Sequence, residues 1–163
     1  MPGIESSLTL SSPTLDIWQD GWSQSQGLLK PPKGAKIGLA INSALGRDQN
    51  QLHIHIACVR SDVLKTLAGI KNFSTDPAKP TKLILPPNNN PYEAIQLSSL
   101  AGNSSPFKVV RLLPHVSSSN IREQSIAIVQ GPQSQTWIFL NNHANGQNKG
   151  EAEELLNQKA CSP

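Results

Sequence analysis

The sequence predicts an α+β fold in which one antiparallel sheet of about five or six strands is bordered by helices. Apolar runs of strand length cluster along the chain, and segments with helical spacing stand apart from them. The 163 residues show no internal repeat and no domain boundary, so residues 1–163 suit a single domain. Charged residues make up only 15% of the chain, and Ser, Asn, Gln and Pro predict long polar loops.

The first element is an amphipathic helix predicted over residues 13–26. Ser12 can cap its first turn, and Pro13 suits the first helical position. Gly21 is unfavourable inside a helix. The residues of its apolar face recur at helical spacing and are Leu15, Trp18 and Trp22.

A β-hairpin is predicted next, with strands at 36–42 and 51–59 joined by the loop 43–50. Ser61 can then cap a helix over 61–70 that carries Asp62 in its first turn. Its apolar side chains are expected to be buried: Val63, Leu64, Leu67 and Ile70.

The second half of the chain combines irregular and β-type segments. Residues 72–106 are rich in Pro, Asn and Ser, which predicts an excursion where only 82–85 and 93–97 can form strands or a short helix. Three β-type runs follow, at 107–113, 124–130 and 135–142, and a short helix is expected at 150–158.

Charge and hydropathy argue against two classes of protein. The net charge is +3, and the basic residues are scattered except for Lys30, Lys33 and Lys36, so sequence-reading nucleic-acid binding is not indicated. That cluster suits a solvated loop or, alternatively, the steering of a modest anionic ligand. No window approaches the roughly 18 apolar residues of a membrane helix, and the first residues lack signal-peptide features, so the chain as written is expected to be soluble.

Histidine and isoleucine alternate in the stretch QLHIHIA at residues 51–57. In a β-strand, Leu52, Ile54 and Ile56 would lie on one face of the sheet and the histidines on the other. His53 and His55, two residues apart, would then lie about 6.5 to 7 Å from each other and could address one bound group.

Three interpretations of this pair compete. A metal site needs a further protein ligand, and only Asp48 and Cys58 are nearby. In the second interpretation the two histidines are simply polar residues on a half-solvated face of the sheet and have no function. In the third interpretation a neutral imidazole attacks phosphorus and forms a covalent phosphoramidate intermediate.

Nucleophilic catalysis needs groups besides the attacking ring. One must hold its tautomer, another must protonate the leaving oxygen, and dipoles must stabilise charge on the phosphoryl oxygens. The polar candidates on the two strands and their loop are Asn42, Ser43, Arg47, Gln49, Gln51 and His55.

The segment INSALGRDQNQLHIHIACVRSDVLKTL resembles the signature of the CDP-diacylglycerol pyrophosphatase family, a branch of the histidine-triad superfamily. The stretches GIES, PFKVVRLLP, EQSIAIV and NKGEAEELLNQKAC also resemble that family, so the likeness covers nearly the whole chain. It implies a histidine-triad-like α+β domain with an antiparallel sheet, and an enzyme of phospholipid metabolism that hydrolyses CDP-diacylglycerol to CMP and phosphatidate. The scheme requires no metal or other cofactor.

The resemblance also implies roles for single residues. The superfamily pattern of three alternating histidines falls on Gln51, His53 and His55, with Gly46 seven residues before His53, which makes His53 the expected nucleophile. His55 would orient and help to protonate the phosphoryl group or the leaving oxygen, and Asn42 would contact the phosphate or nucleoside. The loop over the phosphates would be lined by Arg47 and Gln49. Gln51 departs from the wider superfamily and cannot act as an acid or base.

Two other features of the family bear on this chain. Both cysteines resemble family cysteines, which suggests a Cys58–Cys161 disulfide in an oxidising compartment; as an alternative, both are ordinary small apolar residues. Family members are longer and begin with an anchoring or signal segment, whereas this sequence starts at the GIES point. Either the chain is a naturally short, soluble relative with a changed substrate, or its gene start was misplaced. The expected substrate is a lipid-nucleotide or another small molecule.

Two further functions stay open from the sequence. A histidine-triad-like scaffold could bind an apolar small molecule and guide a rearrangement or cyclisation, for example within a biosynthetic pathway. Alternatively, the chain could be a non-catalytic binding protein that forms a homodimer through its sheet edges. In each case the remaining histidines, His115 and His143, are expected to be surface residues.

Overall fold

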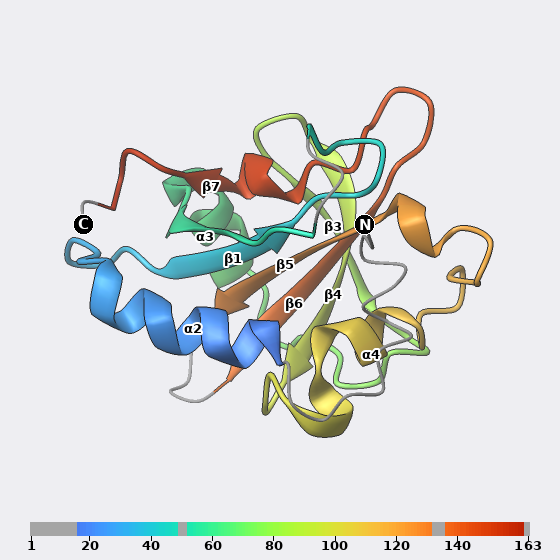
Figure 1. Ribbon diagram of the computed structural model, residues 1–163, viewed down its shortest axis with the longest axis horizontal. Helices are drawn as coiled ribbons and strands as arrows, with labels where there is room; N and C mark the ends of the chain where they lie inside the picture. Colours follow the sequence, from blue (N-terminus) through green and yellow to red (C-terminus); the bar gives the residue numbers. More distant parts are fainter. Residues whose placement is uncertain (1–15, 49–51, 132–135, 162–163) are drawn as a thin grey trace.

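The structure is a computed structural model that describes residues 16–48, 52–131 and 136–161. A single sheet forms its centre, and its strands follow the order β3-β4-β6-β5-β1-β2-β7 with antiparallel pairing throughout (Figure 1). In chain order the strands are β1 (Ile37–Ile41), β2 (His55–Val59), β3 (Thr81–Leu85), β4 (Asn90–Leu97), β5 (Gln124–Gln130), β6 (Trp137–His143) and β7 (Leu156–Asn157). The predicted α+β class with an antiparallel sheet is confirmed, while the relation to the histidine-triad superfamily stays a prediction.

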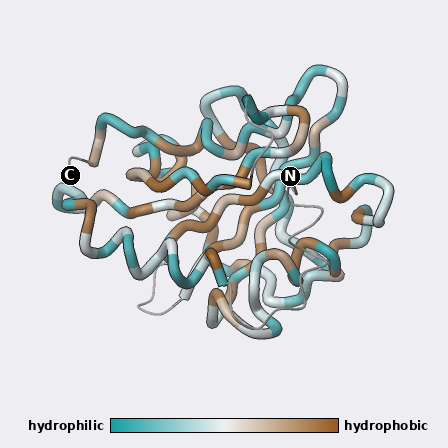
Figure 2. The backbone as a smooth tube through the Cα atoms, viewed as in Figure 1, coloured by the Kyte–Doolittle hydropathy of each residue, from teal (hydrophilic) through white to brown (hydrophobic). Residues whose placement is uncertain are grey.

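Helices cover both faces of this sheet. The α-helices are α2 (Ile17–Leu28), α3 (Ser61–Ala68) and α4 (Pro106–Val110), and the short 3-10 helices are η1 (Gly102–Ser104), η2 (Ile121–Glu123) and η3 (Ala152–Leu155). In Figure 1, α2 and α4 lie across the near face and α3 lies behind the sheet. The apolar strands run between these layers, and hydrophilic loops surround them (Figure 2).

The two layers bury separate cores because strand side chains alternate between the faces. On the α2 side, Trp18 is fully buried against Leu39 and Phe139. On the other side, Val63 and Leu67 of α3 pack with strand residues such as Ala57 and with η3. The packing prediction for Val63 and Leu67 is thus confirmed, whereas Leu64 and Ile70 are only partly buried.

Gly21 is compatible with the helix because it lets α2 approach the sheet closely. A Cβ atom at this position would lie 3.0 Å from Leu39 Cδ2 and 3.5 Å from Ile54 Cδ1. The expected cost of a glycine in a helix is therefore offset by close packing.

The predicted strand at 107–113 is wrong. This stretch forms α4 and the turns that follow it, with Pro106 at the start of the helix and the backbone N–H of Val109 donating to Ser105 O. Val109 and Val110 are buried in the α2-side core, so tertiary packing outweighs their β-propensity.

The helix predicted near the C-terminus, the number of strands and one strand boundary differ from the structure. The predicted helix at 150–158 is the single turn η3 followed by strand β7, which pairs with β2. Residues 82–85 and 93–97 are parts of the hairpin β3–β4, which gives seven strands in the described residues. The hairpin of 36–42 and 51–59 is confirmed, but β2 begins only at His55.

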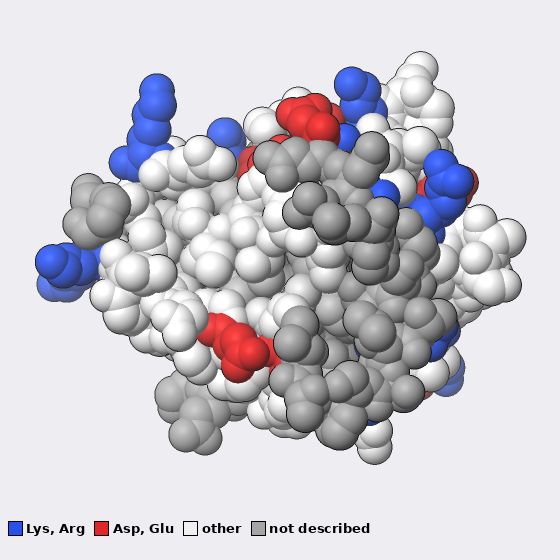
Figure 3. Space-filling model, in the orientation of Figure 1, with Lys and Arg blue, Asp and Glu red and all other residues white. Residues whose placement is uncertain are grey.

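The surface carries no concentrated basic patch on the side that Figure 3 shows. Lys and Arg side chains lie apart around its edges there. Within the predicted lysine cluster, Lys30 and Lys33 are exposed, while Lys36 Nζ donates to Gln130 O at 3.1 Å and Gly131 O at 2.8 Å. These two hydrogen bonds fasten the start of β1 to the end of β5. Burial lowers the pKa of Lys36.

None of the described helices combines the length and the apolar character that crossing a bilayer demands.

Candidate functional site

The two histidines of the alternating stretch lie side by side. Ile54 and Ile56 pack against the α2-side core, as the alternation predicts. His55 stands opposite Ala40 in the β1–β2 register and faces the α3 side of the sheet. The rings of His53 and His55 have their centroids 4.7 Å apart at an interplanar angle of 68°. Both imidazoles therefore address the same region.

A carboxylate that the sequence analysis did not single out holds one of the rings. Glu153, on η3, places Oε2 at 2.9 Å from His55 Nδ1. Asn42 at the end of β1 holds this carboxylate in turn, because its Nδ2 donates to Glu153 Oε1 at 2.9 Å and its Oδ1 accepts from the Glu153 backbone N–H at 3.1 Å. With both oxygens of Glu153 engaged, the orientation of the His55 ring is fixed.

The carboxylate contact also determines the tautomer of His55. When neutral, the ring donates its Nδ1 proton to Glu153 and keeps a lone pair on Nε2. Burial lowers the pKa of His55; the charge of Glu153 opposes this effect, and His53 adds to it. The Nε2 atom is buried and has no hydrogen-bond partner among the described residues.

The segment after β1 forms a tight contact with the loop that precedes η3. The Ser43 N–H donates to Gly150 O at 2.9 Å, and the Ser43 hydroxyl donates to Lys149 O and accepts from the backbone N–H groups of Leu45 and Gly46. Ser43 is fully buried, so its hydroxyl is committed to holding these two loops together.

The remaining predicted binding residues fall in or near the same loop. Asn42 is 4% exposed, and its amide serves Glu153 and the Gly46 carbonyl. Arg47 is half-buried on that loop. Gln49 and Gln51 lie outside the described residues.

Gly46 is required where the two loops meet. A Cβ atom there would lie 2.7 Å from Glu151 Cγ and 2.8 Å from Lys149 O, and the second of these is backbone that cannot rotate away. The loop that carries Asn42 can therefore reach η3 only if residue 46 has no side chain.

We expect Gly46→Ala to reduce the free energy of unfolding by about 1–3 kcal/mol, because the added methyl forces the loops apart. Gly27→Ala is the matched control, since a Cβ atom on this helical residue meets nothing within 4 Å. The control should stabilise the protein by about 0.4–1 kcal/mol. Urea unfolding measures both changes, and an unaltered midpoint for Gly46→Ala would disprove the tight contact.

The predicted disulfide is present between Cys58 and Cys161, 103 residues apart in the chain. Beside it, Val59 of β2 pairs with Leu156 of β7, and the Arg60 N–H donates to Leu155 O at 3.0 Å. These links join η3, and thus Glu153, to the strand that carries His55.

A metal centre is not supported around the histidine pair. In the parts of the chain that the structure describes, no group of three or more His, Cys, Asp or Glu side chains could hold a metal ion. Glu153 instead serves His55 as a hydrogen-bond acceptor.

Sequence reasoning missed Glu153 because nothing local links it to the histidines. It lies 111 residues after Asn42, its hydrogen-bond partner, within a stretch rich in glutamate that reads as the polar side of a helix. The only available signal was the resemblance of NKGEAEELLNQKAC to the family.

Comparison with known proteins agrees with that resemblance. The family model described as CDP-diacylglycerol pyrophosphatase matches residues 1–162. A curated protein from Yersinia pestis, named CDP-diacylglycerol pyrophosphatase, is 44% identical over 71 residues. This alignment covers 41% of the present chain and spans 28% of the length of the Yersinia pestis protein.

Proposed function

Since this chain belongs to the CDP-diacylglycerol pyrophosphatase family, we propose that it is a hydrolase that cleaves the phosphoric anhydride of CDP-diacylglycerol or a similar nucleotide diphosphate ester. His53 is the nucleophile of this reaction, and His55 assists it. The observation that carries the proposal is the chain of contacts from Asn42 through Glu153 to His55, beside the ring of His53.

The roles of the two rings follow from their surroundings. A nucleophile must present an accessible lone pair, and the Nε2 atom of His55 is buried. His53 is half-buried, whereas the ring of His55 is fixed by Glu153. We therefore assign attack on phosphorus to His53 and proton transfer to His55.

The reaction has two steps. In the first, a nitrogen of His53 forms a bond to the nucleotide phosphorus while the anhydride P–O bond breaks, and phosphatidate leaves with a proton that passes from solvent water through the neutral ring of His55. In the second, water attacks the same phosphorus and gives its proton through His55 to the solvent, the P–N bond breaks with its electron pair returning to His53, and CMP is released. His55 stays neutral between the proton transfers because its pKa is lowered, and Glu153 balances its charge when it is protonated.

The direct test is incubation of the protein with CDP-diacylglycerol in detergent micelles. Release of equal amounts of CMP and phosphatidate supports the proposal. A panel of simpler nucleotide diphosphate esters then defines how much of the lipid is needed. If the protein cleaved neither CDP-diacylglycerol nor any member of this panel, the assignment as an anhydride hydrolase would be overturned.

We expect Glu153→Gln to reduce kcat about tenfold or more, since the neutral amide no longer balances charge on His55. Because Glu153 raises the pKa of His55, its loss lowers that pKa further, and the acid limb of the pH–rate profile moves to lower pH. Steady-state rates across the acid limb measure both effects.

Glu151→Gln is the matched control, because the Glu151 carboxylate is bonded to neither His55 nor Asn42. It should keep the wild-type pH profile. If Glu153→Gln lowered kcat but left the acid limb in place, its role would be structural and not electrostatic.

A further inference from the structure

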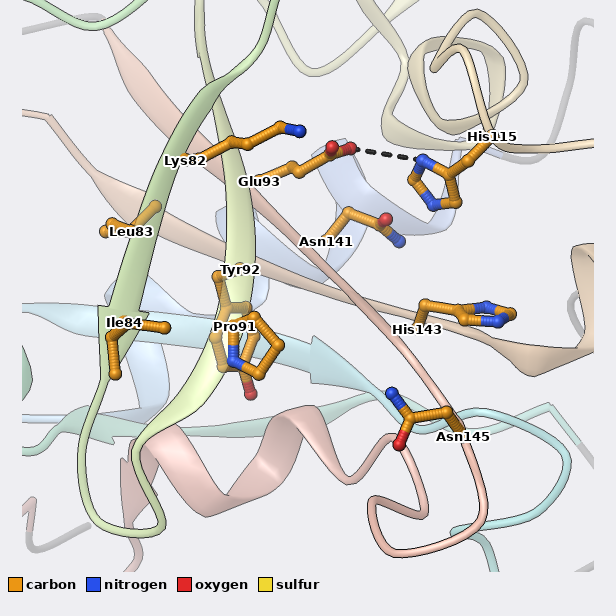
Figure 4. Close-up of a pocket in the computed structure, with 10 residues that line it drawn as sticks. All are labelled: Lys82, Leu83, Ile84, Pro91, Tyr92, Glu93, His115, Asn141, His143 and Asn145. Atoms are coloured by element: carbon orange, nitrogen blue, oxygen red, sulfur yellow. Dashed lines mark ion pairs between the residues drawn. The ribbon is translucent and has the colours of Figure 1, made fainter.

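A second pair of histidines borders a cleft on the opposite face of the sheet. His143, at the end of β6, and His115, in the segment after α4, have ring centroids 5.8 Å apart. Glu93 of β4 places Oε2 at 3.3 Å from His115 Nδ1. All three side chains line a cleft of about 480 Å³. Figure 4 shows the Glu93 carboxylate directed towards the His115 ring.

This cleft is distinct from the site at His53. His55 on β2 is opposite Ala40 on β1. The same row of paired residues crosses β5 and β6 at Ala127 and Leu140 and reaches β4 at Ala94, the chain neighbour of Glu93. Four strand spacings correspond to roughly 19 Å. The side chains of Glu93 and Ala94 also point to opposite faces, so a small ligand cannot contact both sites.

A buried glutamine determines how the two imidazoles are held. Gln124 Nε2 donates to Asn120 O at 3.2 Å and to His143 Nδ1 at 2.8 Å, which uses both of its N–H groups. Its Oε1 therefore faces His115 Nε2, at 3.3 Å, and accepts a hydrogen bond from the N–H at that atom. Both rings are thus fixed in place and form a rigid polar wall.

Other groups in the cleft remain available to a ligand. Lys82 stands opposite Glu93 in the β3–β4 register, and its ammonium group makes no hydrogen bond or ion pair with the rest of the described chain. The Oε1 atom of Glu93 likewise accepts no hydrogen bond from the rest of the described chain. Beside this polar half, Pro91 and the 55% exposed Ile84 form an apolar wall.

We propose that this cleft binds an amino-bearing nucleobase such as cytosine. Its occupant must donate to Glu93, accept from Lys82 and present a flat apolar surface to Ile84 and Pro91. A heterocyclic base with an amino group next to a ring nitrogen or carbonyl meets all three demands, and a carboxylate is a good acceptor for the cytosine amino group. The volume lies in the range of small-molecule sites.

Two other classes of ligand fit less well. A phosphate group would meet the carboxylate of Glu93, and Glu123 lies 3.7 Å from His143 at the far end of the network. A hydrocarbon chain would take Lys82 and Glu93 out of water without providing hydrogen bonds. The base proposal goes beyond the hydrolysis at His53 and does not depend on it.

The test compares cytidine with uridine, which carries a carbonyl oxygen in place of the amino group. Titrations followed by backbone amide NMR shifts should give a dissociation constant for cytidine about tenfold lower than for uridine. The shifts should cluster at Lys82, Glu93 and Asn145. Equal affinities for the two nucleosides would overturn the proposal.

Variants locate the site independently of catalysis. Glu93→Gln should remove the preference for cytidine, and the exposed Lys82→Met should weaken cytidine binding without risk to the fold. Lys79→Met, on the exposed turn before β3, is the matched control and should bind like the wild type. His53→Ala should also bind cytidine normally; loss of binding in this variant would place the nucleoside at the hydrolytic site and refute the second one.

Discussion

Replacing His53 by alanine is expected to lower kcat for the proposed cleavage of CDP-diacylglycerol by about a thousandfold or more, because the variant cannot form the proposed covalent intermediate. The side chain is half-buried and next to His55, so its removal should leave the sheet intact. Rates from CMP release and a melting curve together separate chemistry from folding. Full activity in His53→Ala would remove the nucleophile assignment.

The proposed covalent intermediate can be measured in a second, independent experiment. Wild-type protein that is mixed with labelled substrate and quenched in alkali should retain one nucleotide phosphoryl group on His53, and peptide mapping should locate it. His55→Ala should still accumulate some of this adduct, since its nucleophile is present. An adduct on His55 instead of His53 would reverse the roles of the two rings.

Removal of the disulfide is expected to have the largest effect on stability. The bridge closes a loop of 103 residues, and chain-entropy reasoning assigns about 4 to 5 kcal/mol to a loop of that length. The double variant Cys58→Ala with Cys161→Ala should lose about this much free energy of unfolding in urea. Cys58 is fully buried, so alanine adds a smaller packing loss at that site.

Reduction supplies the control for that experiment. Dithiothreitol should destabilise the wild type to a similar degree and leave the double variant unchanged, because only the wild type has a bridge to break. If the reductant shifted both proteins equally, the stabilisation would have to arise from packing at Cys58 and Cys161 and not from the cross-link.

The local pattern sufficed where a segment's own alternation decides its structure. The strand predicted at 124–130 is β5, and the alternation of His and Ile correctly placed His55 on the face away from Ile54 and Ile56. It failed at 107–113, where β-branched residues are buried by a short helix. It failed again at 150–158, where pairing with β2 replaces the expected helix.

The candidate site was predictable only in part for the same reason. His55 lies on β2, His53 shortly precedes that strand and Asn42 directly follows β1, so the hairpin brings all three together. Glu153 joins them through a contact between distant parts of the chain, which no local pattern encodes. His115 and His143 were expected to be separate surface residues, and the structure places them on one cleft through Gln124.

The position of Glu153 has a consequence for biosynthesis. Ribosomes deliver the histidine pair early, but the acidic partner that orients His55 emerges about a hundred residues later. At a synthesis rate of roughly 5–20 residues per second, the nascent chain contains both histidines for several seconds before Glu153 is added. Competence for the proposed chemistry is thus acquired late, after most of the sheet has been translated.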